Sequence, residues 1–242
     1  MTKPVKPFNR QDSSKKAEVE EMFDDIAPRY DLLNHLLTMG VDIGWRRRAI
    51  RELKQYDPQL IVDIATGTAD FAVEAMALNP SKVIGLDISN EMLRVGRRKI
   101  DKKGLSEKIE LIQGDSEAIQ LETESVDAIT VGFGVRNFEN LEIGLSEIHR
   151  VLRPGKAAAI LEPAFPNKFP LKQLFTFYFR YITPLIGKAV SGSDAAYKYL
   201  PESVRAFPNG EDFLDICRSV GFSKTAYHPL TFGACSLYLI EK

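Results

Sequence analysis

The chain has 242 residues, of which 44% are hydrophobic, and this is enough for one large α/β domain or two small ones. Its formal net charge of -1 excludes a general electrostatic attraction to nucleic acid. No stretch of about twenty residues is apolar enough to span a membrane, and the polar N-terminus lacks the apolar core of a signal peptide. The two cysteines, Cys217 and Cys235, match no metal-ligand spacing, so we expect packed thiols in a reducing cytoplasm.

The first part of the chain is polar and then becomes periodic. Residues 1–16 contain several lysines, and we expect them to form a flexible tail. Apolar residues recur at helical spacing over 17–27, and Pro28 is expected to end this helix. We therefore predict a helical lid over residues 17–55, ahead of the first strand.

Two stretches of this predicted lid carry polar groups. Residues 30–45 mix aromatic, charged and apolar side chains, so they either pack on the sheet as a cap or cover a ligand, with Tyr30 and Asp31 facing it. Trp45, followed by a run of three arginines at 46–48, then opens a further helix that continues to Leu53. Such a run is more often a solvated helix face than a binding patch, and we interpret it in that way.

The clearest local pattern is a strand followed by a turn of small residues. Residues 60–64 form a short apolar run, typical of a strand that is buried on both faces, and helical spacing begins at Phe71. Between them lie Thr66, Gly67 and Thr68, and Gly67 can adopt a positive φ. Ligands of open α/β sheets bind outside the carboxyl ends of the strands, so this turn predicts a binding site.

Acidic residues at the strand ends indicate the kind of ligand. Neither G-x-G-x-x-G nor G-x-x-x-x-G-K-[ST] occurs, and Asp63 and Asp70 are poor neighbours for phosphate. The next strand, 82–87, ends in Asp87, where a ribose diol is commonly held. A third strand, 109–114, ends at Asp115. One such acid is explained by helix capping, but three in series favour a ligand with hydroxyl groups and positive charge. This combination resembles class I methyltransferases that use S-adenosylmethionine.

The rest of the chain continues to alternate strands and helices. We predict helices at 90–103, 141–152 and 210–220, and further strands at 126–133, 157–162, 222–228 and 232–240. This alternation predicts an α/β fold with a mostly parallel seven-stranded sheet. The closely spaced last two strands predict a C-terminal antiparallel hairpin.

Residues 165–209 interrupt the alternation and predict a helical insertion. The stretch 168–187 is dense in aromatic residues, with Lys168, Lys172, Arg180 and Lys188 at or near it. It either packs as the core of a helical subdomain or forms a wall for an apolar substrate that also touches membrane lipid, as interfacial helices do.

Four motifs narrow the resemblance to one family. Residues 30–45, 63–70, 133–137 and 150–155, the last leading to Glu162, look like the quinone C-methyltransferases of menaquinone and ubiquinone biosynthesis. The resemblance covers nearly the whole chain. It implies a single S-adenosylmethionine-dependent domain over 1–242, with the Rossmann-like class I fold and residues 165–209 on the substrate side.

The resemblance implies methyl transfer from S-adenosylmethionine to a ring carbon of a polyprenylated quinol, in particular demethylmenaquinol. Neither the number of histidines nor the spacing of the acidic residues suggests a catalytic metal. In this family the adenine lies near the end of the third strand. The implied cofactor-binding residues are Asp63, Thr66, Gly67, Thr68, Asp87, Ile88, Asp115, Ser116 and Gly132.

Arg136 and Asn137 follow the fourth strand and are the main candidates for stabilising an oxyanion on the acceptor ring. Tyr30 is the third catalytic candidate, and His35 and Asp31 are lesser ones. As a permanent cation Arg136 is a poor base, so it would polarise the hydroxyl or a relay water. The alternative for Arg136 is an ion pair with a carboxylate of the lid.

Two other functions stay open at this point. One is methylation of another lipophilic or phenolic acceptor, including the benzoquinol of ubiquinone biosynthesis, and the other is a non-catalytic protein that binds the cofactor. The expected partners are a polyprenyl naphthoquinol, the membrane surface in transient contact, and a second copy in a homodimer. The expected location is the cytoplasm, peripherally at the inner face of the membrane.

Overall fold

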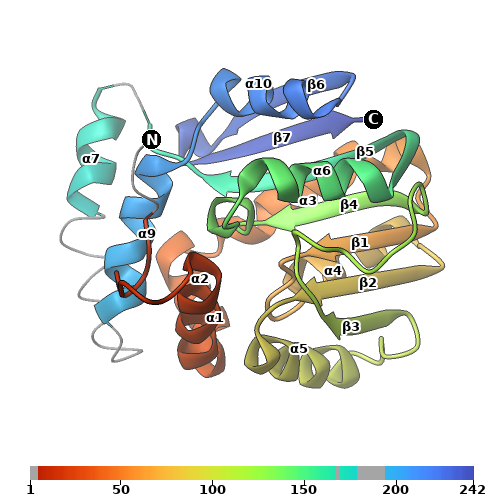
Figure 1. Ribbon diagram of the computed structural model, residues 1–242, viewed down its shortest axis with the longest axis horizontal. Helices are drawn as coiled ribbons and strands as arrows, with labels where there is room; N and C mark the ends of the chain where they lie inside the picture. The colour runs from red at the N-terminus through yellow and green to blue at the C-terminus, as the bar shows by residue number, and fades with distance from the viewer. Residues whose placement is uncertain (1–4, 167–168, 179–193) are drawn as a thin grey trace.

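The computed structural model describes residues 5–166, 169–178 and 194–242. A seven-stranded sheet has the order β3-β2-β1-β4-β5-β7-β6 and lies between two layers of helices (Figure 1). The first five strands are parallel, and β7 is antiparallel to both β5 and β6. The predicted fold class, including the C-terminal antiparallel hairpin, is confirmed.

Most strands begin and end close to the predicted positions. The exception is β5, which begins five residues before the predicted start at Ala157, because Leu152 already pairs with Val126 across an irregularity in the register. The bounds are β1 Leu60–Ile64, β2 Lys82–Asp87, β3 Ile109–Gln113, β4 Val126–Gly132, β5 Leu152–Pro163, β6 Lys224–Leu230 and β7 Cys235–Glu241.

The apolar run of β1 divides between two cores because successive side chains of a strand point to opposite faces. Val62 and Ile64 belong to the core under α6 (Leu141–Val151) and α10 (Glu211–Val220). Ile61 belongs to the core on the other face, with side chains of α3 (Val41–Leu53), α4 (Asp70–Ala75) and α5 (Asn90–Lys102). Cys217 and Cys235 are buried free thiols, as predicted.

The N-terminal helices lie at the carboxyl ends of the parallel strands, on the left of Figure 1. They are α1 (Lys15–Ile26), a 3-10 turn (Ala27–Arg29) that contains Pro28, and α2 (Tyr30–Thr38). The start of α1 lies two residues before the predicted Ala17, and α3 begins before the predicted Trp45. The fully buried Glu18 accepts hydrogen bonds from the backbone N–H groups of Phe8 and Arg10, at 2.6 and 2.9 Å.

Two helices of the predicted insertion are described, α7 (Leu171–Phe177) and α9 (Asp194–Ala206). Residues 179–187 of the predicted aromatic membrane contact, together with Lys168 and Lys188, lie outside the described residues. The remaining helical elements are short 3-10 turns at Lys54–Tyr56, Met76–Leu78, Val135–Asn137 and Thr231–Gly233. In the described part of the chain, no helix is long and apolar enough to cross a membrane.

Candidate functional site

Asp63, near the end of β1, fixes the turn that follows this strand by hydrogen bonds. The Asp63 carboxylate is fully buried and accepts hydrogen bonds from the hydroxyls of Thr66 and Thr130, at 2.5 and 2.7 Å, and from the N–H of Ala72 at 3.1 Å. Burial raises the pKa of Asp63 to about 6, although these donors act against it. Gly67 has a φ of 56°. Asp63 therefore ties the turn, at Thr66, to α4 and to the neighbouring strand β4.

Asp87 connects the end of β2 to the same turn. Its carboxylate accepts the N–H of Gly67 at 2.7 Å and the N–H of Ser89 at 2.9 Å. The residue is 8% exposed, and burial raises the pKa of Asp87 to about 6 against the effect of these donors. Each carboxylate oxygen has two lone pairs, so both can accept a further hydrogen bond from a ligand.

A cavity lies beside this turn, with an empty volume of about 670 Å³ that includes space open to solvent. A second cavity, of about 330 Å³, adjoins it. The two share Tyr30, Ala65, Gly67, Gly132 and Phe133 as lining residues. All nine predicted cofactor residues line one or both: Asp87, Ile88, Asp115 and Ser116 the first, Asp63, Thr66 and Thr68 the second, and Gly67 and Gly132 both.

The first helix closes the Asp115 end of the first cavity. The Nζ atom of Lys16 lies 2.6 Å from an Asp115 carboxylate oxygen and 3.5 Å from one of Glu117. Lys15 donates to the backbone carbonyls of Arg136 and Phe138 at 2.8 and 2.7 Å, and burial lowers its pKa to about 8. Both lysines fall within the predicted flexible tail, where sequence reasoning gave them no role.

Arg136 forms an ion pair with a strand of the sheet. Its Nη1 lies 3.0 Å from Glu162 of β5, and both side chains are almost fully buried. Nη1 also donates to the carbonyl of Phe133, whereas the buried Nε has no partner among the described residues. The alternative prediction, an ion pair between Arg136 and a carboxylate of the lid, is therefore wrong about the partner. Arg136 does form an ion pair, but with Glu162 of the sheet. Arg136 is not a lining residue of either cavity but is next to one that is, Asn137.

Asn137 and Tyr30 both reach the first cavity. The Asn137 amide donates to the carbonyl of Phe133 at 3.3 Å and accepts the hydroxyl of Tyr199, from α9, at 3.0 Å. Burial raises the pKa of Tyr30, so its hydroxyl stays protonated at neutral pH and can act as a donor. The ring of Tyr30 packs edge-on against Phe23 of α1.

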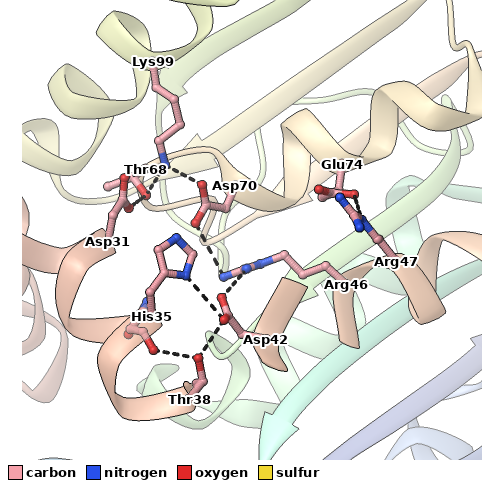
Figure 2. A network of polar contacts seen from close by, with 11 residues as sticks. Asp31, His35, Thr38, Asp42, Arg46, Arg47, Thr68, Asp70, Glu74 and Lys99 are labelled. Atoms are coloured by element: carbon pink, nitrogen blue, oxygen red, sulfur yellow. Dashed lines mark hydrogen bonds and ion pairs between the residues drawn. The ribbon is translucent and has the colours of Figure 1, made fainter. Parts of the chain in front are cut away.

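A network of ion pairs ties the lid to the turn after β1 (Figure 2). Lys99 of α5 lies 2.7 Å from Asp31 of α2 and 2.5 Å from Asp70 of α4. Asp31 also accepts the hydroxyl of Thr68. His35 faces Asp42, at 3.4 Å, and not the cavities. Sequence reasoning missed Lys99, because no local pattern relates it to Asp31.

The arginine run does not form one solvated face. The side chains of Arg47 and Arg48 are 66% and 47% exposed, but that of Arg46 is only 7% exposed. Its Nη1 donates to Asp42 at 2.6 Å, and it lines the second cavity. The interpretation of 46–48 as solvated is therefore wrong for Arg46. The spacing of four residues from Asp42 is the one sequence signal for this pair.

Comparison with solved structures bears on the fold. An S-adenosyl-L-methionine-dependent methyltransferase, named as putative, from Methanococcus maripaludis has a TM-score of 0.62 and 19% identity, covering 100% of this chain and 97% of that one. A methyltransferase from Thermotoga maritima has a TM-score of 0.63 and 18% identity, covering 92% of this chain and 99% of that one. These identities support a common fold and nothing finer.

Relatives in sequence are much closer. A Bacteroides fragilis protein named demethylmenaquinone methyltransferase is 48% identical over 239 residues, 98% of this chain and 97% of that protein. Another of this name from Deinococcus radiodurans is 42% identical, with 100% of both chains covered. The model of the ubiE/COQ5 methyltransferase family matches residues 11–242, a span that includes every lining residue of both cavities. The resemblance seen in the four motifs is thereby confirmed, and the chain belongs to the ubiE/COQ5 methyltransferase family.

Proposed function

We propose that the protein transfers a methyl group from S-adenosylmethionine to a ring carbon of demethylmenaquinol, giving menaquinol. The observation that carries the proposal is the pair of adjoining cavities at the carboxyl ends of β1, β2 and β4, with Asp87 between the first cavity and the turn. The choice of demethylmenaquinol as the acceptor rests on the relatives named demethylmenaquinone methyltransferase, which match this chain over nearly its full length.

The lining residues fit this cofactor chemically. When bound, S-adenosylmethionine supplies an electrophilic methyl group on a sulfonium. Asp87 has lone pairs left for two ribose hydroxyls, and Asp115 and Ser116, the candidates for the adenine, line the same cavity. The small residues Ala65 and Gly67 let the rest of the ligand approach the backbone.

The acceptor carbon becomes nucleophilic when its ring hydroxyl loses a proton, and fixed donors then stabilise the oxyanion. Tyr30 and Asn137 line the first cavity and carry side-chain O–H and N–H donors of the kind that this step needs. Arg136 lies behind Asn137 as a nearly buried cation, and its Nε is the donor free to polarise the hydroxyl or a relay water. The proposal requires no metal, so a chelator should leave the rate unchanged.

The acceptor implied by the relatives is a membrane lipid, and two helices offer apolar side chains to a membrane surface. Leu32 and Leu36 of α2 are 55% and 44% exposed, and Met39, just after this helix, is 81% exposed. On α7, Leu174 and Phe177 are 62% and 54% exposed. The hydroxyl of Tyr178 donates to the carbonyl of Leu37 at 3.0 Å, so the two helices are neighbours. We infer peripheral association with the inner face of the membrane.

The test is methyl transfer by the purified protein from labelled S-adenosylmethionine to demethylmenaquinol, with mass spectrometry of the quinones in a strain that lacks the gene. Accumulation of demethylmenaquinone in that strain supports the proposal. A Geotalea daltonii relative, 41% identical, is named ubiquinone/menaquinone biosynthesis C-methyltransferase, so a demethylated benzoquinol belongs in the same assay. Transfer to the benzoquinol alone, or to neither quinol, would refute the assignment of the acceptor.

A further inference from the structure

The two cavities differ in where they place positive charge. Within the described residues, the lining cations are Lys16 in the first cavity and Arg46 in the second. Lys16 lies at the Asp115 end, where it pairs with Asp115 and Glu117. Arg46 lies beyond Gly67 and Phe133, which the cavities share. A ligand that occupies both cavities therefore meets Arg46 at the end away from Asp115.

Arg46 has donors that its neighbours leave unused. Its one hydrogen bond through the guanidinium, within the described part of the chain, runs from Nη1 to Asp42. Nη2 lies 3.7 Å from Asp70, which is beyond hydrogen-bond distance, and Asp70 is already paired with Lys99. Figure 2 shows Arg46 reaching between Asp42 and Asp70, towards the turn after β1. A guanidinium has five N–H donors, and its planar fork suits a second carboxylate.

The charge around Arg46 favours a particular ligand end. Asp31, Asp42, Asp63 and Asp70 carry four negative charges at neutral pH, while Arg46 and Lys99 carry two positive ones. These groups thus sum to two negative charges, and a lone carboxylate would be repelled. The amino-acid end of S-adenosylmethionine brings its carboxylate together with an ammonium and the sulfonium, a sum of one positive charge. The carboxylate then faces Arg46 while the ligand end as a whole reduces the negative charge of the site.

We propose that Arg46 binds the carboxylate at the amino-acid end of the cofactor, using donors that face the second cavity. The inference rests on the proposed cofactor. It adds that Arg46 makes the site prefer ligands with the amino-acid end over thioether nucleosides that lack it. It is independent of the identity of the acceptor.

The test compares two ligands by calorimetry. S-adenosylhomocysteine has the amino-acid end, whereas 5′-methylthioadenosine shares only the nucleoside and the sulfur. Arg46→Met should weaken binding of S-adenosylhomocysteine by roughly tenfold to a hundredfold, because a buried charge-assisted contact is lost. Binding of methylthioadenosine should change by less than about threefold. Arg46→Lys keeps the positive charge but loses the planar guanidinium. Its affinity for S-adenosylhomocysteine should lie between those of wild type and Arg46→Met.

Two controls separate this role from a structural one. Arg47→Met changes the neighbouring arginine, whose exposed side chain pairs with Glu74, and should bind both ligands like wild type. Asp42→Asn/Arg46→Met also removes the buried carboxylate that Arg46→Met leaves unpaired, and it should show the same loss of preference.

Equal losses for both ligands in Arg46→Met and the double variant, or an unchanged affinity for S-adenosylhomocysteine, would overturn the role of Arg46. Wild-type protein that binds neither ligand would overturn the proposed cofactor itself. Selective binding without transfer to any quinol would support Arg46 and refute only the proposed acceptor.

Discussion

At the scale of single residues, Asp87 is the side chain on which cofactor binding should depend most. Its carboxylate faces the first cavity and organises Gly67 through a 2.7 Å hydrogen bond. Asp87→Ala removes the proposed partner of the ribose hydroxyls and should cost on the order of 2–4 kcal/mol of binding free energy. Calorimetry with S-adenosylhomocysteine measures this. A folded variant with wild-type affinity would disprove the assignment.

The raised pKa of Asp87 also predicts how binding depends on pH. Because the folded protein holds the carboxyl with a pKa of about 6, Asp87 is ionised at pH 7 and becomes protonated as the pH falls through 6. A protonated carboxyl is a poorer acceptor, so affinity for S-adenosylhomocysteine should decline below pH 6, by up to about tenfold per pH unit.

Asp63 has a similar pKa, so the control must separate the two acids. Asp87→Asn should bind more weakly at pH 7 and lose the dependence between pH 5 and 7. If the variant keeps the wild-type slope, a different group titrates, and Asp87 is not the residue responsible.

Arg136 should affect turnover without affecting the cofactor. It lines neither cavity, and its pairing with Glu162 holds it beside Asn137. Arg136→Ala should reduce kcat by roughly a hundredfold or more if the cation stabilises the acceptor oxyanion. The affinity for S-adenosylhomocysteine, measured separately, should be unchanged. A loss confined to cofactor affinity would rule this role out.

At the scale of elements, Lys99 is one of the contacts that join the lid to the helices packed on the sheet. It lies on α5 and bridges Asp31 of α2 and Asp70 of α4 (Figure 2). Lys99→Met should let the start of α2 open more often, raising amide hydrogen exchange there by about fivefold, equal to about 1 kcal/mol. Lys102→Met, on the exposed end of the same helix, should leave exchange in α2 unchanged. An equal effect of both variants would contradict the role of Lys99.

The strands and helices also show which features of the fold and site can be predicted from the sequence. The strands β1 and β2 are mostly apolar runs that end near polar or small residues, so these strands and the cavity residues at their ends could be predicted. The start of β5 at Leu152 could not, because it depends on pairing with Val126 across the sheet. Arg46 and Arg47 are the same residue type, and only the spacing of four residues from Asp42 distinguishes Arg46 in the sequence. That spacing permits the pair, but the burial of Arg46 depends on how α3 packs on the sheet.

At the scale of the whole molecule, membrane association is the main prediction. Changing Lys168, Lys172 and Lys188 together to Glu should abolish flotation with anionic liposomes at low salt, where wild type rises. Lys172 lies on α7, next to the exposed face with Leu174 and Phe177, and the other two lie outside the described residues.

The matched control for flotation carries the same change of charge elsewhere. Lys102, Lys103 and Lys108 are exposed near the end of α5 and the start of β3, at the opposite end of the sheet from the cavities. Changing these three to Glu should leave flotation as in wild type. If the first variant floats normally while folded, or both variants fail alike, residues 168–188 are not the membrane contact. The expected homodimer stays a prediction, and light scattering of the purified protein in solution would test it.

The chain divides its tasks along its length. In the described part, every residue that lines the two cavities precedes Asn140. The insertion meets these residues from outside, through the hydrogen bond from Tyr199 to Asn137 and through Ala196 and Tyr199, which pack with Phe23. We therefore expect the insertion to contribute to the choice of acceptor more than to cofactor binding. A chimaera that takes residues 165–206 from another relative and keeps Tyr199 should retain its affinity for S-adenosylhomocysteine while its choice of methyl acceptor changes.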